Sequence, residues 1–110
     1  MKYNVEVGRT ASQDINAAAT YLAEQLKTPS AARHLLKNVF DCIDSLEQLP
    51  ARCPVIDEPI LEAQRLRMIP VHSYLLFYQI DEAAQTVHVL RFLYGKRNWI
   101  SILKTDFSAE

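Results

Sequence analysis

The chain contains 110 residues, of which 49% are apolar and 23% charged, and its formal net charge at pH 7 is −1. This length and balance predict one globular domain over residues 1–110 and exclude the strong nonspecific nucleic-acid binding of a highly basic protein. The two cysteines, Cys42 and Cys53, are too few for a disulfide framework, and they lack the spacing of metal ligands. We therefore expect neither a metal site nor a bound cofactor.

Charge is distributed unevenly along the chain. Residues 1–62 contain six Lys or Arg against nine Asp or Glu, whereas residues 63–110 contain six against four. The second half can therefore form a local anion-binding surface despite the weak net charge. No apolar run approaches the ~20 residues that span a bilayer, and no secretory signal pattern opens the chain, so we expect a cytoplasmic location.

The first half of the chain predicts a strand followed by two helices. Residues 3–7 alternate apolar and polar side chains, as a half-buried strand does. The T-x-x-Q sequence at residues 10–13 has the form of a capping box, which predicts that a helix begins there. Thr28 and Pro29 predict the start of a second helix, which Pro50 ends. The apolar stripes of the two helices are Ala11, Ile15, Ala18, Ala19, Leu22 and Leu26, and then Ala32, Leu35, Leu36, Val39, Ile43 and Leu46.

The second half predicts a sheet. Residues 50–62 carry three prolines and no periodicity, which indicates a surface loop. Strand patterns occur at 65–70, 73–80 and 86–93, and their short links indicate an antiparallel meander. After Gly95, a short terminal helix is predicted. Its apolar face would contain Trp99, Ile100 and Leu103.

These elements predict an α+β fold of two layers. The link between the two helices is so short that they must form an antiparallel hairpin. The hairpin, residues 10–48, should pack on an antiparallel sheet of three to four strands whose meander is built from residues 65–93. We expect its stripe, with Leu36 fully buried, to contact the strands. The expected partners in the sheet are Leu76, Tyr78 and Val89.

Most enzyme motifs are absent. The histidines His34, His72 and His88 have no serine or cysteine at a recognisable nucleophile turn, and with two glycines there is no glycine-rich phosphate loop. The remaining chemical option is phosphodiester cleavage at a basic site. There, Arg and Lys would neutralise developing charge, and Tyr or His would move a proton.

Basic residues gather in the predicted sheet. Alternation places Arg65 and Arg67 on one face, which is either a solvated outer face or a phosphate clamp. Arg91 lies inside an apolar strand, and it either pairs with a carboxylate such as Asp81 or joins the same basic face. Side chains at a strand end converge on one edge. The strand end around Gly95 carries Tyr94, Lys96 and Arg97.

The order and spacing of these pieces resemble the RelE/ParE family of bacterial toxins over about residues 3–104. The matching pieces are Asp14-Ile15 with Tyr21, residues 29–32, Ile43 through Pro50, residues 66–81 and residues 89–97. The resemblance implies the toxin of a type II toxin–antitoxin pair, which inhibits growth and can serve plasmid stabilization. It also implies an antitoxin partner that wraps the toxin in a hetero-oligomer.

The resemblance implies three alternatives for function. A ParE-like toxin would bind DNA gyrase, and the alanine-rich hairpin favours this branch; its contacts would be Arg91, Lys96, Arg97 and Trp99. A RelE-like toxin would cleave ribosome-bound mRNA, with Arg65, Arg67, Tyr94 and Arg97 as catalytic residues. The chain departs from the nuclease pattern at Leu75 and Leu103, where an arginine and a tyrosine are expected. The third alternative is an inactive member that acts only as a binding module.

Overall fold

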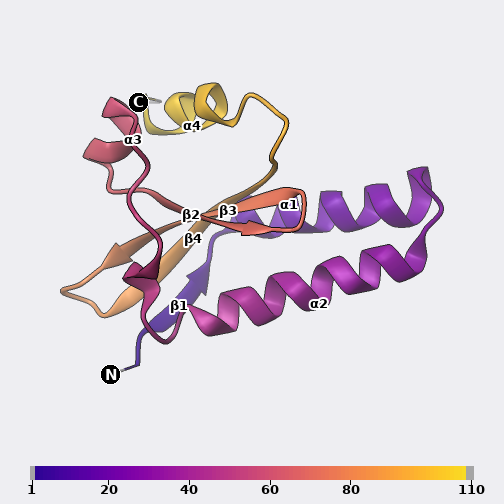
Figure 1. Cartoon of the computed structure of the whole chain (residues 1–110), viewed down its shortest axis with the longest axis horizontal. Helices are drawn as coiled ribbons and strands as arrows, with labels where there is room; N and C mark the ends of the chain where they lie inside the picture. Colours follow the sequence, from indigo (N-terminus) through magenta and orange to yellow (C-terminus); the bar gives the residue numbers. More distant parts are fainter. Residues whose placement is uncertain (1, 109–110) are drawn as a thin grey trace.

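A computed structural model describes residues 2–108. In chain order the elements are β1 (Asn4–Val7), α1 (Arg9–Thr20), the π-helical turn η1 (Tyr21–Gln25), α2 (Pro29–Ser45), the 3-10 turn η2 (Pro50–Arg52), α3 (Pro59–Ala63), β2 (Arg67–Val71), β3 (Tyr74–Asp81), β4 (Thr86–Tyr94) and α4 (Trp99–Ser108). The predicted α+β fold is confirmed. Figure 1 shows α1 and α2 side by side as a hairpin, with α3 and α4 near each other on another side of the sheet.

The sheet has the strand order β1-β4-β3-β2. Strands β2, β3 and β4 form the predicted antiparallel meander. Strand β1 pairs with β4 in the parallel direction, from Asn4 opposite Thr86 to Val7 opposite Val89, so the sheet is mixed. The prediction of a purely antiparallel sheet was wrong for this strand. Because α1, α2 and two further strands separate β1 from β4, no tight turn forces the two into opposite directions.

The N-cap of the first helix is Gly8, two residues before the N-cap Thr10 of the predicted capping box. Helix α1 starts at Arg9 after Gly8, which has no side chain to cap the helix. The Gly8 N–H instead donates to the Val89 carbonyl at 2.9 Å, so the strand pairing of β1 continues to the residue just before the helix. Thr10 therefore lies inside the helix, and the predicted capping box was wrong.

The turn of the hairpin contains an unusual helical segment. At η1 the Leu26 N–H donates to the Tyr21 carbonyl at 3.1 Å, which is the i→i+5 bond of a π-helix. Helix α2 begins at Pro29 as predicted. The Thr28 hydroxyl does not cap it, and donates to the Leu26 carbonyl at 2.9 Å.

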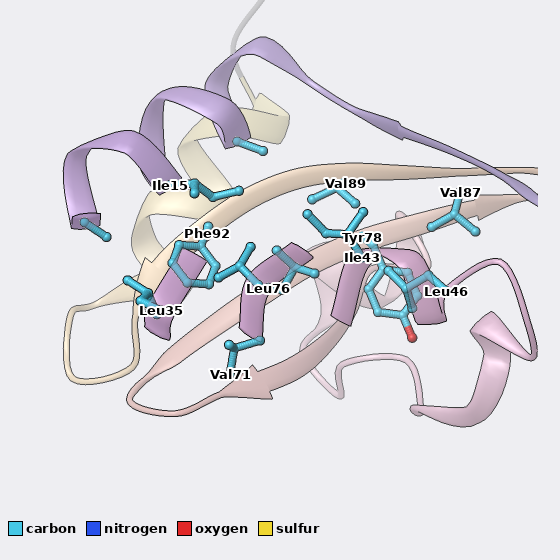
Figure 2. Close-up of a cluster of buried hydrophobic side chains, with 13 residues drawn as sticks. Ile15, Leu35, Ile43, Leu46, Val71, Leu76, Tyr78, Val87, Val89 and Phe92 are labelled. Carbon is cyan, nitrogen blue, oxygen red and sulfur yellow. The ribbon is translucent and has the colours of Figure 1, made fainter. Parts of the chain in front are cut away.

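The helix-side core lies between the hairpin and the sheet. Figure 2 shows side chains of α1, α2 and the strands in this cluster, including Ile15, Leu35, Leu76, Tyr78 and Phe92. Most of the predicted stripe is buried there. Three of its members are only half-buried, namely Ala19, Leu22 and Leu36, and Leu26 is exposed, so the expectation that Leu36 is fully buried was wrong.

A second core covers the opposite face of the sheet, so the predicted two-layer arrangement is incomplete. Phe77 and Leu93 point away from the hairpin and pack with Leu103 of α4 and Leu61 of α3. Helix α3 lies in the segment that we predicted as loop. Its five residues are too few to show helical periodicity.

The start of α3 is fixed by a side chain. The Glu58 carboxylate accepts hydrogen bonds from the backbone N–H groups of Ile60, at 2.9 Å, and Leu61, at 3.0 Å. This is the role of an N-cap residue, and Pro59 occupies the first helical position. The bond from Leu61 is the main cause that holds the pKa of Glu58 below its ordinary value.

Substitution of two neighbouring leucines tests which side of α2 faces the core. Leu35 is 4% exposed in the helix-side core, whereas Leu36 is half-buried. Leu35→Ala should lower the free energy of unfolding by about 2–5 kcal/mol. Leu36→Ala should lower it clearly less, as measured by urea denaturation. A larger loss for Leu36→Ala would contradict this orientation of the helix.

Candidate functional site

The structure divides the predicted basic residues between two ends of the sheet. Arg67 lies opposite Tyr78 across β2 and β3, whereas Tyr94 lies opposite Tyr74 across β4 and β3. Tyr74 and Tyr78 are four residues apart on β3, which is about 13 Å along the strand. The nuclease set of Arg65, Arg67, Tyr94 and Arg97 is therefore not assembled around one point.

The Arg67 side chain is hydrogen-bonded to the chain segment that follows α2. Its guanidinium Nη1 donates to the carbonyl of Cys53 and, at 3.4 Å, to that of Ala51. The buried Tyr78 hydroxyl donates to the Pro50 carbonyl at 2.7 Å, and burial raises the pKa of Tyr78. Arg67 and Tyr78 thus anchor this segment to the sheet through its backbone carbonyls.

Arg65 is exposed, but strand alternation does not orient it. Strand β2 begins at Arg67, and Arg65 occupies a turn after α3 with φ of 55°. Its N–H donates to the Glu62 carbonyl at 2.9 Å. The two arginines therefore do not form a pair on one face of a strand, and the prediction from alternation was wrong here.

Arg91 pairs with two carboxylates, neither of which is Asp81. Its Nε and Nη2 donate to the Asp14 carboxylate at 2.7 and 3.1 Å, and its Nη1 donates to Asp106 at 3.0 Å. The side chains of Arg91 and Asp14 are only 16% and 15% exposed. The bonds to Asp14 are the largest cause of a raised pKa at Arg91. This guanidinium therefore joins α1, β4 and α4 and has little freedom to bind a target.

Tyr94 and Arg97 line a groove in the structure. The groove has a volume of about 590 Å³ and lies between the hairpin and the end of the sheet where β4 stops. Tyr74 stacks on Phe92 with ring centroids 4.9 Å apart and meets Tyr94 edge-on at 5.6 Å. The other lining residues are Asp14, Ala17, Ala18, Tyr21, Leu22, Leu26 and Ser73.

A smaller cavity of about 280 Å³ shares Leu22, Ser73 and Tyr74 with this groove. It extends the groove toward His34 of α2 and His72 of the β2–β3 turn. The two hollows adjoin each other between the hairpin and the sheet. Their walls are mainly apolar and aromatic, with single polar groups, which is typical of binding sites.

The turn after β4 presents two cations to solvent. Lys96 and Arg97 are exposed, and neither makes an ion pair within residues 2–108. The turn is fixed by Gly95, whose N–H donates to the Ser73 carbonyl at 2.8 Å. Trp99 packs against Phe77 with ring centroids 5.4 Å apart, so it anchors the turn to the second core.

Sequence reasoning missed part of this site. Tyr74 was not predicted as a site residue and Leu26 was assigned to the helix stripe, yet both line the groove. The Asp14–Arg91 pair could have been inferred from the sequence. Asp14 lies beside the buried stripe of α1, and Arg91 lies within an apolar strand. Charged side chains in such positions are seldom buried without a partner.

No group of three His, Cys, Asp or Glu side chains in residues 2–108 is arranged to hold a metal ion. None of the helices in this range is long and apolar enough to cross a membrane.

The family model of the ParE toxin of type II toxin–antitoxin systems, parDE, matches residues 5–99. The chain belongs to this family. No curated protein sequence matches it significantly. The match covers the whole hairpin and the whole meander, and it includes the residues of the groove and of the turn after β4.

Solved structures share the fold at low sequence identity. A chain of the chromosomal ParDE system from P. aeruginosa has a TM-score of 0.68 and 13% identity over 84% of this chain and 96% of that one. A chain of the RelBE2 toxin–antitoxin complex from Mycobacterium tuberculosis has a TM-score of 0.57 and 24% identity, over 86% and 99%. The isolated E. coli RelE toxin has a TM-score of 0.52 and 16% identity, over 94% and 96%. Both toxin branches therefore share this architecture.

The structural role of Arg91 gives a stability prediction. Arg91→Met leaves the Asp14 carboxylate without its partner at a nearly buried position, which should lower the free energy of unfolding by about 3–5 kcal/mol. Asp106→Asn, at a more exposed carboxylate, should cost about 1 kcal/mol or less. The Arg91→Met, Asp14→Asn double variant should recover part of the loss in urea denaturation. Equal stability of the wild type and Arg91→Met would contradict the proposed role.

Proposed function

We propose that this ParE-family toxin inhibits growth by binding DNA gyrase rather than by cleaving RNA. The observation that carries the proposal is the separation of the basic residues. Arg65 and Arg67 lie at one end of the sheet, and Tyr94 and Arg97 lie at the other. A binding surface can use one end alone, whereas the nuclease set would require both.

The geometry that general acid–base catalysis requires supports the same conclusion. A proton donor must come within about 2.6–3.2 Å of the reacting group, and the cations that stabilise the developing charge must lie around the same atoms. The backbone positions of Arg67 and Tyr94 are about 13 Å apart along β3. The Arg67 guanidinium is in addition bonded to the carbonyls of Ala51 and Cys53, which favours a structural role over one at the same reacting atoms. Leu75 and Leu103 also stand where the nuclease pattern has an arginine and a tyrosine.

The gyrase-binding surface is centred on the turn after β4, which we call the basic edge: Tyr94, Lys96 and Arg97. Tyr94 is 38% exposed beside the two solvent-exposed cations. Exposed aromatic and arginine side chains are the types enriched in protein interfaces. Arg91 does not belong to this surface because Asp14 and Asp106 hold it, and Trp99 contributes by fixing the turn.

An antitoxin is the second partner in this proposal. The structural relatives include a ParDE system and a RelBE2 toxin–antitoxin complex. The groove under the hairpin has the apolar walls that a helix or extended segment of a small protein can fill. An acidic residue on that segment would meet Arg97.

The nuclease alternative keeps one specific observation in its favour. Tyr94 and Arg97 line the same groove, so a proton donor and a cation lie close to each other. In this alternative the ribosome would supply the remaining groups. The nuclease makes the hydroxyl of Tyr94 indispensable as a proton donor, whereas gyrase binding requires only its ring.

Two parallel assays test the proposed target. The purified toxin should inhibit DNA supercoiling by purified gyrase in a dose-dependent manner. Primer extension on ribosome-bound mRNA should reveal no new cleavage ends when the toxin is induced. Cleavage ends together with unimpaired supercoiling would overturn the proposal in favour of the nuclease.

The Tyr94→Phe variant distinguishes RNA cleavage from gyrase binding. The change removes the hydroxyl proton donor but keeps the ring that packs on Tyr74. Growth inhibition should persist, since a single surface substitution shifts stability by only about ±0.5 kcal/mol. A matched Tyr74→Phe variant controls for loss of a hydroxyl in the same groove. Loss of growth inhibition in Tyr94→Phe alone would favour the nuclease.

A further inference from the structure

The basic edge is positioned by a turn that belongs to another part of the sheet. The Gly95 N–H donates to the Ser73 carbonyl at 2.8 Å, and Ser73 lies in the two-residue turn between β2 and β3. A Cβ atom at Gly95 would lie 3.1 Å from the same carbonyl oxygen, which is closer than ordinary van der Waals contact. Glycine therefore permits this close approach, and the direction of Lys96 and Arg97 depends on where the Ser73 carbonyl lies.

The far end of the same segment has an independent anchor. Trp99 packs against Phe77 in the second core, and its N–H donates to the Arg97 carbonyl at 2.8 Å. The second core thus fixes where the segment ends. Where the segment begins depends on β4 and on the exposed turn that carries Ser73.

The turn between β2 and β3 has an unusual conformation. His72 has a φ of 56°, in the left-handed region that residues other than glycine seldom adopt. His72 and Ser73 are both exposed and lie between the paired residues Val71 and Tyr74, so no neighbouring strand holds them. A turn of this kind persists where a contact from the surrounding structure stabilises it.

Helix α2 supplies such a contact. The side-chain nitrogen of Asn38 donates to Nε2 of His72 at 2.5 Å, although 34 positions separate the two residues. The residue after Asn38 is Val39, which is fully buried in the helix-side core, so packing fixes the position of Asn38. The His72 side chain also borders the smaller hollow of about 280 Å³. The hydrogen bond to Asn38 therefore links the turn to the helix.

We propose that Asn38 and His72 are positioning residues for the basic edge. The hydrogen bond from α2 holds the turn, the turn holds the Ser73 carbonyl, and that carbonyl holds Gly95 and the two cations that follow it. Without the bond, the edge occupies its binding geometry for a smaller fraction of the time, and its affinity for gyrase falls by the same factor. The effect on gyrase rests on the proposed function, whereas the link between α2 and Gly95 does not.

Hydrogen exchange in the isolated toxin tests this link without any partner. Asn38→Ala should speed exchange of the Gly95 amide roughly two- to tenfold, which corresponds to the loss of one hydrogen bond. Amides in the middle of β3 should change far less. Asn16→Ala removes the same type of side chain from an exposed position on α1, so it is the matched control and should leave Gly95 unchanged. Unchanged exchange at Gly95 in Asn38→Ala would overturn the inference.

Supercoiling assays with purified gyrase test the consequence for function. Asn38→Ala should raise the toxin concentration needed for half-inhibition roughly two- to tenfold. His72→Asn should do the same, because asparagine tolerates the left-handed turn but is shorter than histidine. Both changes remove one bond, so the double variant should inhibit about as well as either single variant.

Two results would contradict the positioning role. One is an additive loss in the double variant. The other is weaker inhibition by Asn38→Ala without faster exchange at Gly95, which would mean that Asn38 contacts gyrase directly. Failure of the wild-type toxin to inhibit gyrase would instead defeat the proposed function, and the exchange of the Gly95 amide would still decide whether α2 positions the edge.

Discussion

The ion pair between Arg91 and Asp14 is the interaction on which the arrangement of this toxin depends. The Asp14 carboxylate accepts two bonds from Arg91 and a third, at 3.0 Å, from the backbone N–H of Phe92. It thereby fixes α1 against the middle of β4, and the remaining Arg91 nitrogen reaches Asp106 on α4. One buried charge thus holds the layers on both faces of the sheet. The same contact sets the position of the groove wall next to Phe92.

A β-bulge determines which side chains reach the groove. Phe77 lies opposite Arg91 and Tyr78 opposite Val89, so Leu90 is an extra residue in β4. Val89 and Phe92 consequently face the same helix-side core although an odd number of positions separates them. Without the bulge, strict alternation would turn Phe92 away from the hairpin. The cluster of aromatic side chains that lines the groove, Tyr74, Phe92 and Tyr94, therefore depends on this bulge.

Local patterns predicted most of the fold. The apolar stripes of the hairpin and the alternation of the three consecutive strands are periodic over many residues, so their type was evident from the sequence. The direction of β1 and the existence of α3 were not, since β1 has four residues and α3 five. Their structure is decided by pairing with β4 and by burial of Leu61, which are tertiary effects.

The site was predictable in part. Tyr94, Lys96 and Arg97 come after or at a strand end, where exposure and convergence can be inferred from spacing. The partners of Arg91 and Arg67 could not be inferred, because Asp14 lies 77 positions from Arg91 and because backbone carbonyls, which bind Arg67, leave no trace in the sequence. The groove was missed for a related reason: an α-helical stripe assigns Leu26 to the core, and the π-helical turn changes its environment.

The central claim is that gyrase contacts the end of the sheet that carries Arg97 and not the end that carries Arg65. Both arginines are exposed, so alanine at either position should leave stability nearly unchanged. Supercoiling inhibition by purified Arg65→Ala and Arg97→Ala, measured side by side against the wild type, tests the claim most directly. The account predicts a marked loss for Arg97→Ala and near wild-type inhibition for Arg65→Ala. Equal losses, or a loss confined to Arg65→Ala, would contradict it.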